Sequence, residues 1–136
     1  MIKVVIDTNV VVSANLSDEG PAAATVSLAT NKKILMFVLP AVMAEYEGVL
    51  HRPRLKLDPA KIAASLALIR NASIEVLPTT TLTISNHESD NRFYECADAA
   101  EADYLITGNT VHFQQGPQNR DDYNAQEVYR SDCFVA

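Results

Sequence analysis

The sequence lacks several features that would place it in a specialised class of protein. It has only two cysteines in 136 residues, and Cys96 and Cys133 have neither metal-binding nor redox spacing. No apolar run approaches the roughly 20 residues that span a bilayer. Asp7 interrupts the apolar N-terminus too early for a secretory signal. We therefore expect a single domain over residues 1–136, without a membrane segment, in a reducing cytoplasm.

Positive charge is also scarce. The chain has 11 Lys and Arg residues against 17 Asp and Glu residues, which gives a net charge of −6. A protein that merely binds nucleic acid usually has a basic face, so this balance argues against that class. The acidic residues either gather around a cation or form a well-solvated surface, and charge alone does not distinguish the two.

Short apolar segments alternate with segments of helical periodicity along the chain. Strands are predicted over residues 2–6, 34–39, 74–77 and 103–107, and helices over 10–16, 22–29 and 41–50. Two further helices are predicted, one after the capping pair Asp58-Pro59 and one that begins at Asp90. This alternation predicts a three-layer α/β/α sandwich with a central, mostly parallel sheet. Residues 114–136 are polar and weakly patterned, with a hint of a strand only at 132–135.

Four polar residues fall where ligands bind in such a sheet, beyond the carboxyl ends of the strands. Asp7 ends the first strand, and Asn109 lies two residues past the end of the fourth. Asp90 opens the helix before the fourth strand, and Glu45 lies one turn past the start of the third helix. Crowded carboxylates repel one another unless a cation intervenes, and oxygen ligands favour Mg²⁺ or Mn²⁺. Hydrolysis of a phosphodiester is the chemistry that suits this arrangement.

Each of these residues also has an ordinary structural interpretation. Asp7 and Asp90 are both suited to cap a helix, and Glu45 alone reads as a solvated helix residue. Thr8 and Asn9 are good turn residues that need no ligand. The case for a site therefore depends on the residues taken together.

Four segments taken in order resemble the PIN-domain family, in the branch of toxins from toxin–antitoxin systems. These segments are VVIDTNVVVSA (residues 4–14), EYEGVLHRP (45–53), DNRFYECA (90–97) and ADYLITGN (102–109), and the resemblance covers nearly all of residues 1–113. It implies a ribonuclease that uses Mg²⁺ or Mn²⁺, with Asp7, Glu45 and Asp90 as catalytic acids and metal ligands. It also implies an RNA substrate, an antitoxin protein as partner, and a homodimer.

The sequence departs from the family pattern at the fourth acidic position. Many relatives have an aspartate where this chain has Asn109, and others have an acid where it has His112. Asn109 can still offer a carbonyl oxygen to a metal, but it adds no negative charge. Asp121 or Asp122 would supply the missing acid only if the polar segment 114–136 folded back. A catalytically impaired module that binds RNA or an antitoxin without cleavage is therefore the alternative.

Substrate contacts are expected beside the acids. Thr8, Asn9 and Ser13 follow the first strand, and Arg52 and Arg54 belong to a basic stretch after the third helix. The arginines either contact RNA phosphates or simply interact favourably with the negative end of the helix dipole. Ser13 either positions substrate or satisfies its hydroxyl within the helix. A phosphotransfer enzyme is a third class, but a phosphatase of the haloacid-dehalogenase type has a second aspartate where this chain has Asn9.

Overall fold

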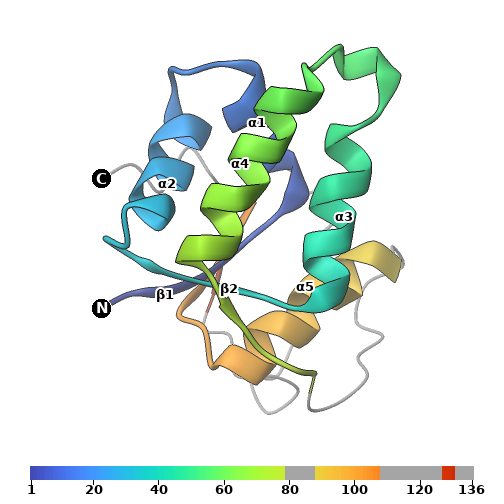
Figure 1. Cartoon of the computed structure of the whole chain (residues 1–136). Coiled ribbons are helices and arrows are strands. Elements are labelled where there is room, and N and C mark those ends of the chain that lie inside the picture. The colour runs from blue at the N-terminus through green and yellow to red at the C-terminus, as the bar shows by residue number, and fades with distance from the viewer. Residues whose placement is uncertain (79–87, 108–126, 131–136) are drawn as a thin grey trace.

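The computed structural model describes residues 1–78, 88–107 and 127–130 (Figure 1). The helices are α1 (Thr8–Leu16), α2 (Pro21–Thr30), α3 (Pro40–Leu50), α4 (Pro59–Ala72) and α5 (Glu88–Ala100), with a short 3₁₀ helix η1 (Pro53–Leu55). The strands are β1 (Lys3–Ile6), β2 (Leu35–Val38), β3 (Ile74–Glu75), β4 (Tyr104–Thr107) and β5 (Glu127–Arg130). Within these ranges, no helix has both the length and the apolar composition needed to cross a bilayer.

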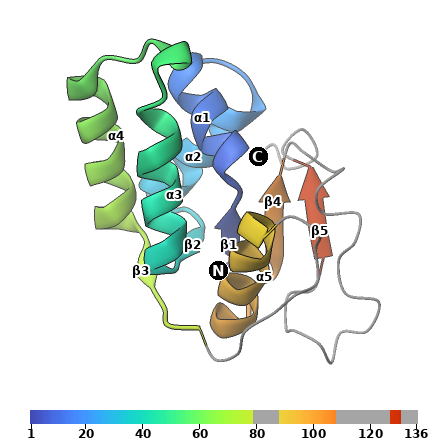
Figure 2. The ribbon, with the colours of Figure 1, turned by 90° about the vertical axis from the view of Figure 1, so that its right-hand side faces the viewer.

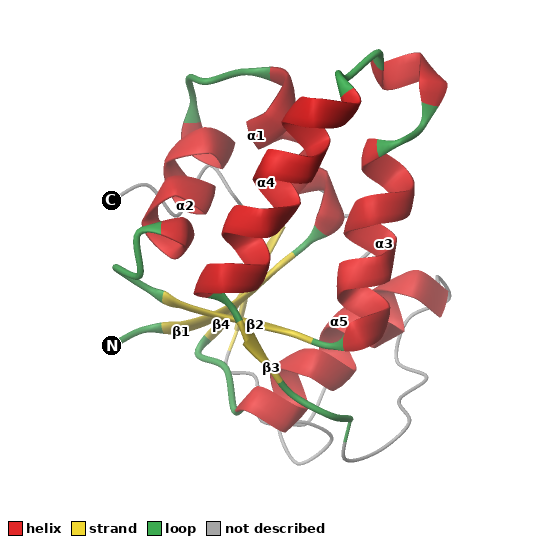
Figure 3. Ribbon diagram, viewed as in Figure 1, coloured by secondary structure: helices red, strands yellow, loops and turns green. Residues whose placement is uncertain are grey.

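The five strands form one parallel sheet in the order β3-β2-β1-β4-β5. Helices α1 to α4 lie on one side of this sheet and α5 lies on the other (Figure 3). The predicted α/β/α architecture with a parallel sheet is therefore confirmed. Because β1 is the central strand, its carboxyl end lies between the ends of its two neighbours, β2 and β4.

The core lies where the helices cover both faces of the central strands. Val4, Val5 and Ile6 of β1 and Leu105 and Ile106 of β4 are all 0% exposed. Continuous apolar runs of this kind are typical of strands that are buried on both faces. The three-layer packing thus explains why these strands show no alternation of polar and apolar residues.

A pair of hydrogen bonds between β1 and the residue before β4 fixes the amino-terminal edge of the sheet. The Asp103 carboxylate accepts a hydrogen bond from the Lys3 N–H at 2.9 Å, and the Asp103 N–H donates to the Lys3 carbonyl at 2.8 Å. We predicted that the strand begins at Asp103, but the structure begins it at Tyr104 because Asp103 makes this reciprocal contact instead. The contact fixes the register that places Ile6 beside Ile106.

The start of α5 and the position of the last strand also differ from the prediction. Helix α5 begins at Glu88, so Asp90 lies within its first turn and does not cap it. The last strand, β5, lies at Glu127–Arg130, inside the segment that we interpreted as irregular, whereas 132–135 lies outside the described residues. β5 is an edge strand of only four residues, Glu-Val-Tyr-Arg, with a charged residue at each end. Such a strand lacks the apolar run that revealed the buried strands.

Candidate active site

Asp7 lies at the carboxyl end of the central strand and is 4% exposed. It occupies the N-cap position of α1, yet its side chain makes no capping hydrogen bond. Its Oδ2 instead accepts a hydrogen bond from the Thr107 hydroxyl at 2.8 Å, and its N–H donates to the Ile106 carbonyl at 2.9 Å. The side chain is therefore held between the ends of β1 and β4 and does not act as a helix cap.

Glu45 is connected to the same place from helix α3. Its Oε2 accepts a hydrogen bond from the hydroxyl of Thr8, which is 5% exposed. Because Thr8 directly follows Asp7 in the chain, this bond brings the α3 carboxylate to the carboxyl end of β1. Glu45 is half-buried, so it is not an ordinary solvated helix residue.

Tyr46 was not among the predicted site residues, but it supports both acids. Its side chain is 0% exposed, and its hydroxyl donates to the carbonyl of Ile6, the residue before Asp7. Its ring packs against that of Phe93, with centroids 6.4 Å apart and planes at 38°, and so connects α3 to α5. The sequence signal was the position of a large aromatic residue directly after Glu45, on the apolar face of the third helix.

The pKa of the Tyr46 hydroxyl is affected by both acids. Burial raises the pKa of the Tyr46 hydroxyl well above its ordinary value, and interactions with Cys96, Asp7 and Glu45 raise that pKa further. A charge affects a buried hydroxyl in this way only at short range. Tyr46 therefore lies within electrostatic reach of both carboxylates.

Helix α5 carries the third predicted acid. Asp90 lies in its first turn, and the helix packs against β1, β2 and β4. Its neighbour Asn91 is 1% exposed. The Asp90 side chain lies outside what the structure describes, and so do Asn109 and His112. Among the described side chains, no group of three or more His, Cys, Asp and Glu residues is arranged to hold a metal ion.

Helix α5 also carries a buried carboxylate that is paired with a cation. Glu95 is 5% exposed, and both of its oxygens face the Arg92 guanidinium, with Oε1 2.8 Å from Nε and Oε2 3.0 Å from Nη2. Glu95 was not among the predicted site residues, although its spacing of three residues from Arg92 is typical of a helical ion pair. Glu95 therefore differs from Asp7 and Glu45, whose described hydrogen bonds come from threonine hydroxyls.

The predicted substrate contacts fall into two groups. Thr8 is buried and its hydroxyl donates to Glu45, so it lies beside the two carboxylates. Asn9 and Ser13 are exposed on α1, and Arg52 and Arg54 are exposed beside η1. In the described part of the chain, no hydrogen bond or ion pair joins these four exposed residues to Asp7 or Glu45.

Comparison with known proteins gives consistent matches. The family model of the PIN domain matches residues 3–111. An uncharacterized protein of Methanocaldococcus jannaschii is 30% identical over 110 residues, which are 79% of this chain and 70% of that protein. A chain in the crystal structure of VapBC2 from Rickettsia felis, bound to a DNA fragment from their promoter, superposes with a TM-score of 0.61. This last match covers 95% of this chain and 98% of the other, but at 17% identity it shows similarity of fold alone.

Proposed function

The chain belongs to the PIN-domain family, and we propose that it is a divalent-metal-dependent endoribonuclease that acts as the toxin of a toxin–antitoxin pair. The observation that supports this most directly is the pair Asp7 and Glu45 at the carboxyl edge of the sheet. Each of these acids accepts a hydrogen bond from a threonine hydroxyl that carries no charge.

The donor set suits a hard divalent cation. Carboxylate oxygens are the ligands that Mg²⁺ and Mn²⁺ prefer, and a neutral hydroxyl orients a carboxylate without cancelling its charge. Asp7 and Asp90 would hold the metal directly, and Asn109 would offer a carbonyl oxygen. When bound, the ion supplies charge stabilisation at the phosphate and a more acidic water.

The residues of the chain position the reacting groups. Thr107 fixes one oxygen of Asp7, so that the carboxylate keeps one orientation at the end of β1. Glu45, held by Thr8, would bind the metal or orient the water that attacks in line with the leaving oxygen. Tyr46 donates to the carbonyl of the residue before Asp7 and so fixes the position of α3 relative to β1.

An antitoxin protein is the proposed partner. The structural neighbour from Rickettsia felis is the pair VapBC2 on promoter DNA, and the similarity of fold extends over nearly the whole of both chains. That a homodimer forms remains a prediction from family resemblance.

The test is cleavage of a labelled mixed-sequence RNA by the purified chain with Mn²⁺, with Mg²⁺ and with excess chelator. We expect metal-dependent cleavage that Asp7→Asn abolishes. The matched control is Asp103→Asn, which makes the same change in an acid at the opposite edge of the sheet.

The alternative function predicts a different result. Asn109 replaces an acid of the family pattern, so a module that binds RNA or an antitoxin without cleavage would show no turnover with either metal. That outcome, obtained with protein that unfolds cooperatively, would overturn the proposed nuclease.

A further inference from the structure

The connection from α3 to α4 carries concentrated positive charge in a chain of net charge −6. We define the basic corner as Arg52, Arg54, Lys56 and Lys61, whose side chains are all exposed. Across the residues that the structure describes, none of the four takes part in an ion pair. Asp58 is the only acid in the corner, and it caps α4 by accepting the Ala60 N–H at 3.0 Å. The positive charge of the corner is therefore available to an external anion.

The backbone of the basic corner is held in one conformation. The Leu55 N–H donates to the Arg52 carbonyl at 3.0 Å, and the Lys56 N–H donates to the Pro53 carbonyl at 3.1 Å. Lys56 has φ 51° and ψ 36°, a left-handed conformation that glycine adopts most easily. The turn itself would thus favour glycine at this position, so the fold does not account for the lysine.

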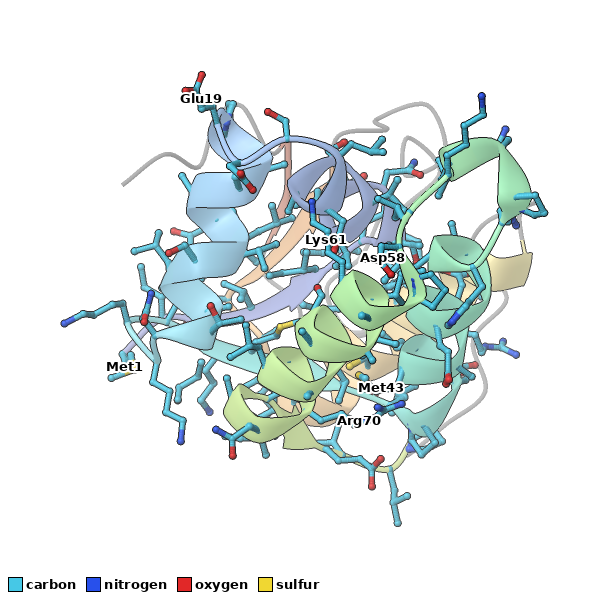
Figure 4. The ribbon with its side chains drawn as sticks, turned by 45° about the horizontal axis from the view of Figure 1, so that its top comes forward. Met1, Glu19, Met43, Asp58, Lys61 and Arg70 are labelled. Atoms are coloured by element: carbon cyan, nitrogen blue, oxygen red, sulfur yellow. The ribbon has the colours of Figure 1, made fainter. Side chains whose placement is uncertain are left out.

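The basic corner lies at the same end of the molecule as the two acids. Figure 2 shows the arrows of β1, β4 and β5 pointing toward the end at which α3 joins α4. Figure 4 labels Asp58 and Lys61 at the beginning of α4, next to this connection. Glu45 lies five residues before the end of α3 at Leu50, which is about 8 Å along the helix, and Arg52 follows two residues after that end. The positive charges therefore begin just beyond the carboxyl end of the helix that carries Glu45.

The surface between Glu45 and Arg52 has no side chain at Gly48. Gly48 follows Glu45 by three residues, so the two lie on the same face of α3. It is exposed, and a Cβ added there would meet nothing within 4 Å. Glycine weakens a helix interior relative to alanine, and nothing in the packing requires it here. The bare backbone does allow a ligand chain to lie close to the helix.

We propose that the basic corner and the face of α3 at Gly48 bind the phosphate backbone of a single-stranded RNA beside Asp7 and Glu45. This inference rests on the proposed nuclease function and names the path of its substrate. Arginine forks match phosphate oxygens, and positive charges gathered on one short connection suit a single backbone. An acidic protein would also be attracted, but it would need neither the bare helix face nor the alignment with Glu45.

The test measures binding apart from cleavage, by fluorescence anisotropy of a short labelled RNA in excess chelator at several salt concentrations. For single strands, each phosphate contact adds about 0.7 to the slope of log K against log salt. At about 0.1 M salt, loss of one contact therefore weakens binding about fivefold. We expect this from each of Arg52→Ala, Arg54→Ala and Lys56→Gly, and a loss of roughly a hundredfold from the triple variant.

Two matched controls separate this effect from changes in fold. Lys32→Gly also removes a lysine from a left-handed turn, at φ 59°, but at the amino-terminal edge of the sheet, and it should leave affinity unchanged. Gly48→Gln should weaken RNA binding without lowering the melting temperature. Ala67→Gln, at an exposed position of α4, should affect neither property.

The outcomes distinguish the inference from the proposed function. If the triple variant binds RNA with the wild-type affinity and salt slope while the wild type cleaves, this inference is wrong and the nuclease stands. If the wild type binds RNA through the basic corner but never cleaves, the nuclease is wrong. If polyglutamate binds at the corner and RNA does not, the surface serves an acidic protein and the inference is overturned.

Discussion

The hydrogen bond from Thr107 to Asp7 should affect both the stability and the activity of the protein. Thr107 is 0% exposed, and its hydroxyl lies 2.8 Å from Oδ2 of a carboxylate that is 4% exposed. Thr107→Val keeps the β-branched shape that suits a strand and removes only the donor. A hydrogen bond to a charged group contributes about 1.5–3 kcal/mol, and its loss leaves the buried carboxylate less well solvated. We therefore expect the free energy of unfolding to fall by about 2 kcal/mol.

Thr25→Val is the matched control for this prediction. Thr25 is also 0% exposed, but its hydroxyl donates to the neutral carbonyl of Pro21, at 2.8 Å. A bond between neutral groups contributes about 1 kcal/mol, so the two variants should differ by roughly 1 kcal/mol. Urea unfolding with an unchanged m-value measures that difference. Thr107→Val should also reduce metal-dependent RNA cleavage, whereas Thr25→Val should not.

An equal loss of stability in the two variants would refute this reasoning, because it would mean that the charge on Asp7 adds nothing to the bond. Full cleavage activity in Thr107→Val would refute the second part. In that case the orientation of Asp7 would be set by other contacts.

Three further predictions concern the support of the site and the helices around it. Tyr46→Phe should lower the free energy of unfolding by about 1 kcal/mol, because it removes the donor to the Ile6 carbonyl. It should also lower RNA turnover, and unchanged turnover would show that Tyr46 does not position Asp7. Burial raises the pKa of the Cys96 thiol from 9.0 to about 12, so the folded state holds this proton more tightly than the unfolded state does. The contribution of the thiol to the free energy of unfolding is therefore complete below pH 9 and is lost as the pH rises toward 12. Urea midpoints across this range should fall less steeply with pH in Cys96→Ala than in the wild type, and parallel curves would contradict the assignment. Asp58→Ala removes the helix cap that accepts the Ala60 N–H, so it should lower the free energy of unfolding in urea by about 1 kcal/mol. RNA cleavage should not change, and a loss of cleavage would show that the start of α4 matters for the site.

The fold was largely predictable because its central strands are buried on both faces. The apolar runs at β1 and β4 need only local sequence to be recognised, and alternation with helices then dictates a parallel sheet. β5 at Glu127–Arg130 was not predicted, because an edge strand carries little of this signal. The predicted start of α5 was two residues too late, because Asp90 has the side chain of a typical helix cap. A residue type of this kind locates the end of a helix only when the cap geometry itself is known.

The hydrogen-bond partners of the predicted acids could not be read from the sequence. Strand ends and spacing predict that Asp7 and Glu45 lie at one edge of the sheet, and in the structure both carboxylates raise the pKa of the buried Tyr46 hydroxyl. The bonds from Thr107 and Thr8 join residues that are 100 and 37 positions apart, and no local pattern encodes such pairs. Thr8 had been interpreted as a turn residue or a weak substrate contact, and its hydrogen bond to Glu45 assigns it a role in holding the carboxylate.

Glu95 differs from the other two acids in the kind of group that is described beside its carboxylate. Glu95 is buried against the Arg92 guanidinium, so its charge is already neutralised within one helix. The hydrogen bonds described for Asp7 and Glu45 come from hydroxyl groups, which fix a carboxylate in place and leave its charge intact. Partly buried negative charges of this kind are costly unless a cation joins them, because burial removes the water that would otherwise solvate them. Binding of a divalent ion should therefore raise the stability of the wild type, should do so much less in Asp7→Asn, and should be unaffected by the removal of Glu95, which has its own cation.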